Sequence, residues 1–206
     1  MPTLTGLGER VHLLDERVGL DLHVDDIANV LRYEDLYDVI LVGHSYGGPV
    51  VTGAADRVPE RVAKLVHLDS VYPRNGQSVA DVLPLVNRLR DRGDTVDGVE
   101  LILLPRPDGG PFYGVDDPDD RAWMAGRLTA FPWRCFADPL RLEDPARVAA
   151  IPSFHVLCPA SLADRDPEVL AAAEARGALW VVDTSHDLMI SEPRAVVDLL
   201  AEIAAR

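Results

Sequence analysis

A serine between two glycines is the first feature of this sequence that could do chemistry. The run Gly43-His-Ser-Tyr-Gly47 fits the pattern G-x-S-x-G, in which the serine occupies a sharp turn between a strand and a helix. Glycine at both flanking positions would let the strand and the helix approach closely. Backbone N–H groups at the start of that helix would face the negative charge that forms on an attacked acyl group. We therefore predict Ser45 as a nucleophile and the N–H of Tyr46 as an oxyanion donor.

The residues around this run fit the same motif. A short apolar run, 39–42, precedes it, and an Ala/Val-rich segment, 49–57, follows it. They match the buried strand and the helix that the motif requires. The alternative is that the glycines only permit tight packing and that Ser45 caps the helix. The match on both sides favours the nucleophile.

A serine hydroxyl needs a base within hydrogen-bond reach and an acid that orients the base. In enzymes with this motif the acid and then the histidine follow the serine along the chain. His186 lies in a polar loop after the last predicted strand, so we predict it as the general base. His44 precedes the serine and is expected to line the site as a substrate contact. The remaining histidines precede the motif or lie within apolar strands, where packing is the expected role: His12, His23, His67 and His155.

The acid has two candidate positions. Asp69 ends the strand after the serine motif, whereas Asp164 (or Asp166) lies in the loop after Cys158. Both strands end at the same end of the sheet as the serine, so topology alone does not decide between the two candidate acids. We favour Asp69, because a strand end holds a carboxylate more rigidly than a loop does. Otherwise Asp69 would cap the following turn.

The elements that must position these residues alternate between strand and helix. With 206 residues the chain fits one domain, and residues 1–20 are expected to form a loop. The predicted helices are 21–33, 49–57, 166–176 and 193–205, and the predicted strands are 39–42, 63–69, 153–158 and 178–182. Short links between them indicate right-handed crossovers. The pattern predicts an α/β fold with a mostly parallel sheet flanked by helices.

The segment 72–150 differs from the rest of the chain. Prolines recur, Gly109-Gly110 interrupts it, and helical fragments are expected only at 79–91 and 119–129. It holds much of the aromatic content: Phe112, Tyr113, Trp123, Phe131 and Trp133. Such an insertion over the carboxyl ends of parallel strands would form a helical lid and a substrate pocket. Trp123 and Phe131 are the candidate substrate contacts, although each could equally belong to the core of the lid.

Composition narrows the class of ligand. A net charge of −14 disfavours nucleic acid and anionic membranes as partners, and favours a small-molecule substrate. No apolar run approaches the roughly 20 residues of a membrane span, and no signal pattern begins the chain, so a cytoplasmic location is expected. The two cysteines, Cys135 and Cys158, suit neither a disulfide framework nor a zinc site. We expect no metal and no cofactor, and a homo-oligomer is possible.

Several segments together match a known family. They are Pro2 to Arg10, Gly43 to Gly48, Leu68 to Ser70, Leu128-Thr129, Pro132, Pro139-Leu140, His186-Asp187 and Met189. Through them the chain resembles the α/β-hydrolase superfamily, in particular esterase-like members related to plant methylesterases and hydroxynitrile lyases. The resemblance implies Ser45 as nucleophile and His186 as base. Many relatives carry the acid where this chain has Ser161, but other branches carry it at the position of Asp69.

The resemblance also exposes a difference at the front of the chain. Relatives carry further strands and a His-Gly loop before the segment that starts at Pro2, and that loop donates a second oxyanion N–H. Loss of one such donor costs about 10²–10³ in rate. Without those strands the strand at 39–42 would lie at a sheet edge. We expect the chain to be a fragment of a longer reading frame, and so a partial α/β-hydrolase fold, or else that another chain covers this edge.

These inferences lead to a serine hydrolase, carboxylesterase-like, that cleaves a small ester through an acyl-enzyme. Two alternatives remain open. One is a lyase or cyclising enzyme that uses the same Ser/His pair as a proton relay and forms no acyl-serine. The other is a catalytically silent ligand-binding protein. The lid has no motif that identifies the substrate.

Overall fold

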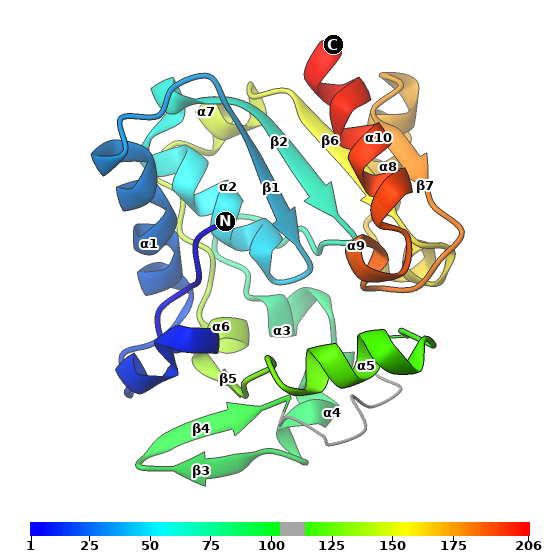
Figure 1. The fold of residues 1–206 in the computed structure, drawn as a ribbon. Helices are drawn as coiled ribbons and strands as arrows, with labels where there is room; N and C mark the ends of the chain where they lie inside the picture. Colours follow the sequence, from blue (N-terminus) through cyan, green and yellow to red (C-terminus); the bar gives the residue numbers. More distant parts are fainter. Residues whose placement is uncertain (104–113) are drawn as a thin grey trace.

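A parallel sheet of four strands forms the centre of the fold (Figure 1). The structure is a computed structural model that describes residues 1–103 and 114–206. In spatial order the strands are β1 (Val39–His44), β2 (Val62–Leu68), β6 (Ser153–Leu157) and β7 (Leu179–Val181). Each neighbouring pair is parallel, as the alternation of strand and helix predicts. The expected α/β fold with a parallel sheet is confirmed.

Helices cover both faces of this sheet. On one face α1 (Leu20–Tyr33) and α2 (Gly47–Arg57) pack against Leu41 and Leu65. On the other face α10 (Pro193–Ala205) packs against Val66. Leu65 and Val66 are consecutive in β2, so their side chains point to opposite faces of the sheet. The remaining long helix, α8 (Pro167–Ala175), precedes β7.

Residues between β2 and β6 form the insertion that the sequence indicates as a lid. Figure 1 shows most of it gathered at the end of the sheet toward which the arrows of β1 and β2 point, whereas its last helix, Pro145–Ala149, lies at the opposite end. Its helices are short: α3 (Val79–Val82), α4 (Leu85–Arg90), α5 (Pro118–Ala125), α6 (Arg134–Ala137) and α7 (Pro145–Ala149). The predicted helix at 79–91 is divided in two at Leu83, which precedes Pro84. The α conformation is disfavoured for a residue that precedes a proline. The predicted helix at 119–129 starts at Pro118 and ends at Ala125.

A small antiparallel sheet in the insertion was not predicted. It contains β3 (Asp94–Val96), β4 (Val99–Ile102) and β5 (Phe131–Pro132). Asp97 and Gly98 connect β3 to β4, and both have positive φ, 49° and 82°. An Asp-Gly pair with this conformation forms a tight hairpin turn, so the signal for this hairpin was present in the sequence. Phe112, Tyr113 and Gly109-Gly110 lie outside the described residues.

The start of the chain contains more structure than the predicted loop. Residues Gly8–Leu13 form a 3₁₀ helix, and the segment before it is tied to α1. Thr5 donates to Asp26 through both its backbone N–H and its hydroxyl, at 2.6 and 2.9 Å. Gly8 N–H donates to Thr129 Oγ1 at 3.0 Å, which links this segment to the insertion. These contacts hold the first residues beside α1 and the insertion.

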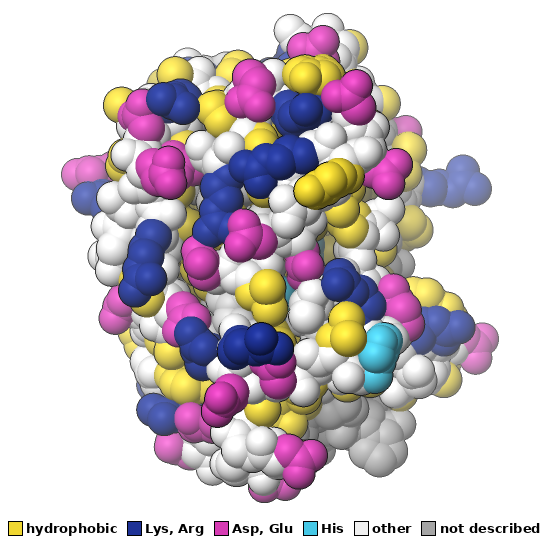
Figure 2. Space-filling view, turned by 90° about the vertical axis from the view of Figure 1, so that its left-hand side faces the viewer, with side chains coloured by type: hydrophobic (Ala, Val, Ile, Leu, Met, Phe, Trp, Pro, Cys, Tyr) yellow, Lys and Arg dark blue, Asp and Glu magenta, His cyan; other side chains and the backbone are white. Residues whose placement is uncertain are grey.

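The strand β1 lies at the edge of the sheet, as expected. Among the strands that the structure describes it pairs with β2 alone, and Val42 in its centre is 39% exposed. Figure 2 shows one face of the surface, where acidic side chains lie beside basic ones. None of the helices within the described ranges has the length and apolar character needed to cross a bilayer.

Candidate active site

Ser45 occupies the turn between β1 and α2 in a conformation that few residues other than glycine adopt. Its φ is +52°, in the left-handed region. Its N–H donates to Leu68 O at 3.0 Å, which ties the turn to the end of β2. Ser70 Oγ donates to Ser45 O at 2.8 Å. A strained residue held by bonds from two sides is typical of a functional turn.

Two glycines make this turn possible, and only one of them was predicted. A Cβ on Gly43 would lie 2.5 Å from Gly47 O, so strand and helix approach too closely for any larger residue. A Cβ on Gly48 would lie 1.7 Å from Ser70 Oγ. The prediction that Gly47 must also be glycine is wrong, because a Cβ there would meet nothing within 4 Å. The close contact belongs to its neighbour Gly48.

The three predicted catalytic side chains meet at the carboxyl ends of the strands. His186, in the loop after β7, has Nε2 2.9 Å from Ser45 Oγ and Nδ1 2.6 Å from Asp69 Oδ2. An ionised carboxylate only accepts, so Nδ1–H donates to Asp69 and Nε2 is free to accept the serine proton. Of the two candidate acids, Asp69 contacts the histidine. Asp164 lies in the 3₁₀ helix η4 (Pro159–Asp164), and Asp166 caps α8.

Asp69 is completely buried and held by several donors. Its Oδ1 accepts the N–H of Cys158 at 3.0 Å, and its Oδ2 accepts the hydroxyl of Ser161 at 2.7 Å. Burial alone would raise the pKa of Asp69, but the hydrogen bonds from His186, Cys158 and Ser161 outweigh it and lower the pKa to about 2. The acid is therefore ionised at neutral pH. Sequence reasoning missed both Cys158 and Ser161 as its donors.

His44 holds the histidine loop. Its Nε2 donates to His186 O at 2.9 Å, and the two rings lie 4.7 Å apart. Burial lowers the pKa of His44 to about 4, so the ring is neutral and this nitrogen carries the proton. The Asp187 carboxylate lies 3.6 Å from the same nitrogen, and burial raises its pKa to about 6. His44 was predicted as a substrate contact; the structure places it against the base.

His44, His186 and Asp187 also present ligand atoms within 4.8 Å of one another, which is close enough for a metal ion. However, Nε2 of His44 donates to a carbonyl, and both ring nitrogens of His186 have hydrogen-bond partners. A metal would have to displace these bonds. The arrangement is better suited to proton transfer.

Tyr46 anchors the turn from within the protein. Its ring is buried, and its hydroxyl lies 2.9 Å from His23 Nδ1. His23 Nε2 lies 2.8 Å from Thr5 O, which can only accept, so Nε2 carries the proton and Tyr46 donates to Nδ1. The side chain thus fixes the residue whose backbone N–H is the predicted oxyanion donor. Sequence reasoning left His23 as a packing residue and missed this contact.

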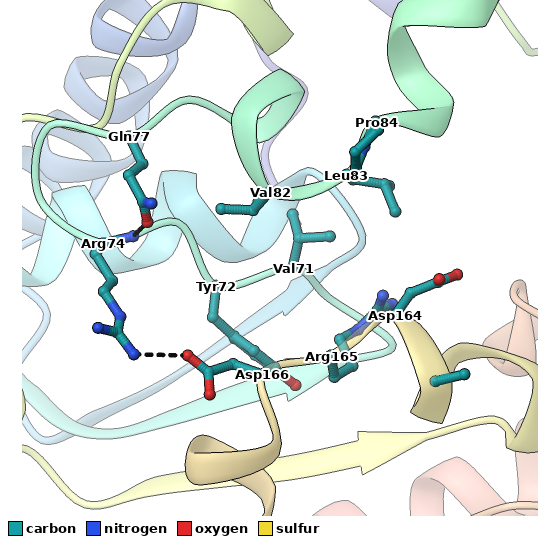
Figure 3. Close-up of a pocket in the computed structure, with 11 residues that line it drawn as sticks. Val71, Tyr72, Arg74, Gln77, Val82, Leu83, Pro84, Asp164, Arg165 and Asp166 are labelled. Atoms are coloured by element: carbon teal, nitrogen blue, oxygen red, sulfur yellow. Dashed lines mark hydrogen bonds and ion pairs between the residues drawn. The ribbon is translucent and has the colours of Figure 1, made fainter.

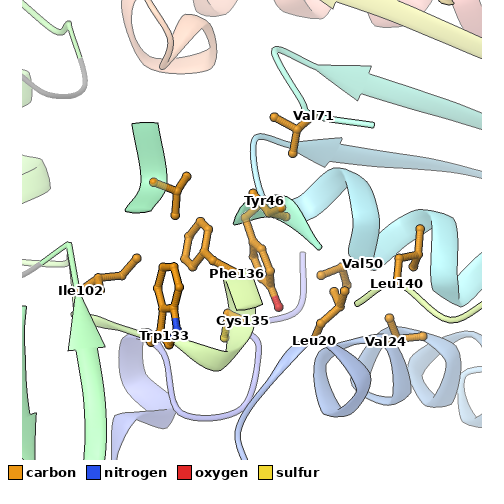
Figure 4. Close-up of a cluster of buried hydrophobic side chains, with 12 residues drawn as sticks. Leu20, Val24, Tyr46, Val50, Val71, Ile102, Trp133, Cys135, Phe136 and Leu140 are labelled. Atoms are coloured by element: carbon orange, nitrogen blue, oxygen red, sulfur yellow. The ribbon is translucent and has the colours of Figure 1, made fainter. Parts of the chain in front are cut away.

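The other two candidate substrate contacts differ in position. Phe131 packs edge-on against Tyr46 with ring centroids 5.6 Å apart, beside the buried cluster that Figure 4 shows around Tyr46, Trp133 and Phe136. Trp123, on α5, is 53% exposed, and the Arg127 guanidinium lies over its ring. Phe131 is therefore tied to the residue after the nucleophile, whereas Trp123 lies at the surface. Their role in binding substrate stays a prediction.

His67 and His155 are buried in β2 and β6, as predicted for packing residues. Their rings stack at 5.2 Å, and burial lowers their pKa values to about 3 and about 4, so both are neutral. Within the described part of the chain, Nδ1 of each lacks a hydrogen-bond partner. They are therefore packed but not fully satisfied.

Substitution of Gly43 and of Gly47 by alanine should affect the stability of the protein differently. Gly43→Ala should lower the free energy of unfolding by about 1–3 kcal/mol, because the added methyl group meets backbone atoms that cannot move aside. Gly47→Ala should leave it unchanged or raise it by up to about 1 kcal/mol, because alanine suits a helix better than glycine. Urea denaturation of both variants measures the difference. Equal losses in the two variants would contradict the packing described for this turn.

Comparison with known proteins gives the family. The model of the alpha/beta hydrolase family matches residues 1–199. A carbendazim hydrolyzing esterase of Nocardioides sp. (strain SG-4G) is 49% identical over 83 residues, which are 40% of this chain and 34% of that protein. Putative methylesterase 11 of Arabidopsis thaliana is 21% identical over an alignment that covers 98% of this chain and 55% of the methylesterase.

A solved structure supports the fold over nearly the whole chain. Polyneuridine aldehyde esterase superimposes with a TM-score of 0.73 and 18% identity, covering 98% of this chain and 86% of the esterase. The chain spans only part of the two curated relatives named above, 34% and 55% of their lengths. The family match is nevertheless almost complete along this sequence. The protein therefore belongs to the alpha/beta hydrolase family and has esterases among its relatives.

Proposed function

We propose that this protein is a serine hydrolase that cleaves a small ester through an acyl-enzyme intermediate. One observation carries the proposal: the continuous hydrogen-bonded chain from Ser45 Oγ through His186 to the buried Asp69, with distances of 2.9 and 2.6 Å. A nucleophile, a base and an acid in contact are the arrangement that activates a serine hydroxyl.

In the proposed reaction each group has one step. Ser45 Oγ attacks the ester carbonyl carbon while its proton passes to His186 Nε2. Asp69 stabilises the imidazolium that forms, and the N–H of Tyr46 supports the oxyanion. The imidazolium then gives its proton to the departing alcohol oxygen, leaving the acyl group on the serine. Water, deprotonated by His186, attacks this acyl-enzyme and releases the carboxylic acid.

The relatives support an ester as the substrate class. They include a carbendazim hydrolyzing esterase and a putative methylesterase. Phe131 lies against Tyr46, next to the nucleophile, and offers an apolar surface near the turn. We propose a small and fairly apolar ester, and carbendazim is a suitable member of a first substrate panel.

Removal of the nucleophile tests the reaction. Ser45→Ala should abolish hydrolysis of a chromogenic short-chain ester, because the alanine has no oxygen that can attack. Ser185→Ala is a matched control, because it removes a hydroxyl from the loop that holds His186. This hydroxyl bonds to Ser191 at 3.4 Å rather than to a residue of the triad. Turnover is measured together with circular dichroism to confirm folding. Unchanged turnover in the folded Ser45 variant would remove the proposal.

The two candidate acids provide a second contrast. Asp69→Asn should lower turnover by about 10⁴-fold, since the amide keeps the shape but loses the charge that orients the histidine. Asp164→Asn should change turnover little, because the two ring nitrogens of His186 bond to Asp69 and Ser45. Steady-state kinetics on both variants separate the possibilities. A large loss of turnover in Asp164→Asn together with nearly normal turnover in Asp69→Asn would show that Asp69 is not the acid.

A further inference from the structure

The guanidinium of Arg165 lies buried behind the acid of the triad. Only 5% of the Arg165 side chain is exposed, and its Nη2 donates to Asp69 O at 3.0 Å. The same nitrogen lies 4.0 Å from Asp69 Oδ1. A buried charge is costly unless an opposite charge lies nearby. Here that charge is the carboxylate on which the proposed reaction depends.

We propose that Arg165 is a positioning residue for this reaction: it fixes the backbone of Asp69 and places a positive charge beside the pair of Asp69 and His186. This inference rests on the proposed function. Arg165 contacts neither Ser45 nor His186 through any hydrogen bond that the structure describes, so it acts through Asp69.

The backbone of Asp69 needs such support. Its φ is +43°, a left-handed conformation that is costly for a residue with a side chain. Its N–H donates to Val156 O at 2.7 Å, and its carbonyl accepts from Arg165. With both peptide groups bonded, the strained residue has one orientation. The carboxylate therefore faces His186.

The donors to Asp69 come mostly from one short segment. Cys158 and Ser161 bind the carboxylate, and Arg165 binds the carbonyl. Cys158 precedes η4, Ser161 lies within it and Arg165 follows it. The helix η4 follows β6, whereas Asp69 follows the neighbouring strand β2. The loop after β6 therefore holds Asp69, the acid that follows the adjacent strand β2, in place through hydrogen bonds.

Several charged and titratable groups surround Asp69. Besides Arg165, the titratable side chains that contact Asp69 or whose pKa depends on its charge are His186, Cys158, His44, Tyr72 and Asp187. Burial lowers the pKa of His44 to about 4 and raises that of Tyr72, so both are neutral at pH 7. Asp187, with its pKa raised by burial to about 6, adds a negative charge above that pH. The guanidinium of Arg165 lies beside these groups and adds a positive charge.

The sign of its effect on protonation follows directly. A positive charge beside the pair of Asp69 and His186 opposes the uptake of a proton by either group. Removal of that charge favours proton uptake. The acidic limb of the pH profile of kcat/KM reports protonation of the base in the free enzyme, so this limb should move to higher pH.

The cavity beside Arg165 offers a matched control. A cavity of about 430 Å³ is lined by Tyr72, Arg74 and Arg165 and by apolar residues that include Val82 and Leu83 (Figure 3). Arg74 is exposed and pairs with Asp166 at 2.8 Å. It shares the cavity with Arg165 but has no contact with Asp69. Arg74→Gln therefore removes a positive charge from the lining of the same cavity without removing a bond to the triad.

Two substitutions of Arg165 separate charge from geometry. Arg165→Gln keeps a donor for the Asp69 carbonyl but loses the charge, and should raise the acidic limb by about one pH unit. Arg165→Lys keeps the charge but loses the planar fork, and should leave the limb in place while kcat falls by about 10-fold. KM should change little in either, because Arg165 stands behind the acid. Arg74→Gln should match the wild type.

A second readout does not depend on turnover. The proton on His186 Nδ1, bonded to Asp69, gives a low-field resonance in proton NMR whose change with pH reports protonation of the pair of Asp69 and His186. The titration midpoint should rise in Arg165→Gln and stay in place in Arg165→Lys. If the wild-type protein turned over no ester, the proposed function would fail while this measurement would still test Arg165.

Two outcomes would overturn the inference. One is an acidic limb and an NMR midpoint that stay in place in Arg165→Gln, since the charge would then have no effect on the pair. The other is an equal displacement of the limb in Arg165→Gln and Arg165→Lys, because lost packing alone would explain it. If Arg165→Gln does not fold, a displaced limb in folded Arg165→Lys would likewise overturn the inference, because that variant keeps the charge.

Discussion

The hydrogen bond between Asp69 and His186 is the interaction on which the rest of the site depends. A carboxylate that is completely buried costs several kcal/mol unless donors and an opposite charge surround it. Here His186, Ser161 and Cys158 donate to it, and Arg165 lies 4.0 Å away. These partners keep the acid charged without access to water. Only a charged acid can stabilise the imidazolium that the proposed mechanism requires.

The order of the strands brings these groups together. The strands β1, β2 and β6 are neighbours, so the residues that follow them meet at the carboxyl end of the sheet. Backbone hydrogen bonds continue beyond the strands: Ser45 N–H donates to Leu68 O at 3.0 Å, and Asp69 N–H donates to Val156 O at 2.7 Å. Both strained residues, with φ of +52° and +43°, are thereby fixed to the next strand. The rigidity of the sheet is passed to the side chains that carry the chemistry.

Much of this arrangement could be predicted, because it rests on local patterns. Apolar periodicity located the four strands and the long helices to within a few residues, and the motif around Ser45 with the order of serine, acid and histidine selected the residues that meet. What could not be predicted depends on contacts between distant parts of the chain. Arg165 follows Asp69 by 96 residues and His23 precedes Tyr46 by 23, and no local pattern pairs them. The close approach of Gly48 to Ser70 was missed for the same reason.

The most direct test of the account is to trap the covalent intermediate. An activated short-chain ester is mixed with the protein, the reaction is quenched within the first turnover, and the chain is digested and analysed by mass spectrometry. We predict a burst of about one alcohol per active chain, with the acyl group on the peptide that contains Ser45. Turnover without a burst and without an acyl group on Ser45 would contradict it, because the hydrogen-bonded chain from Ser45 to Asp69 would then serve some other chemistry.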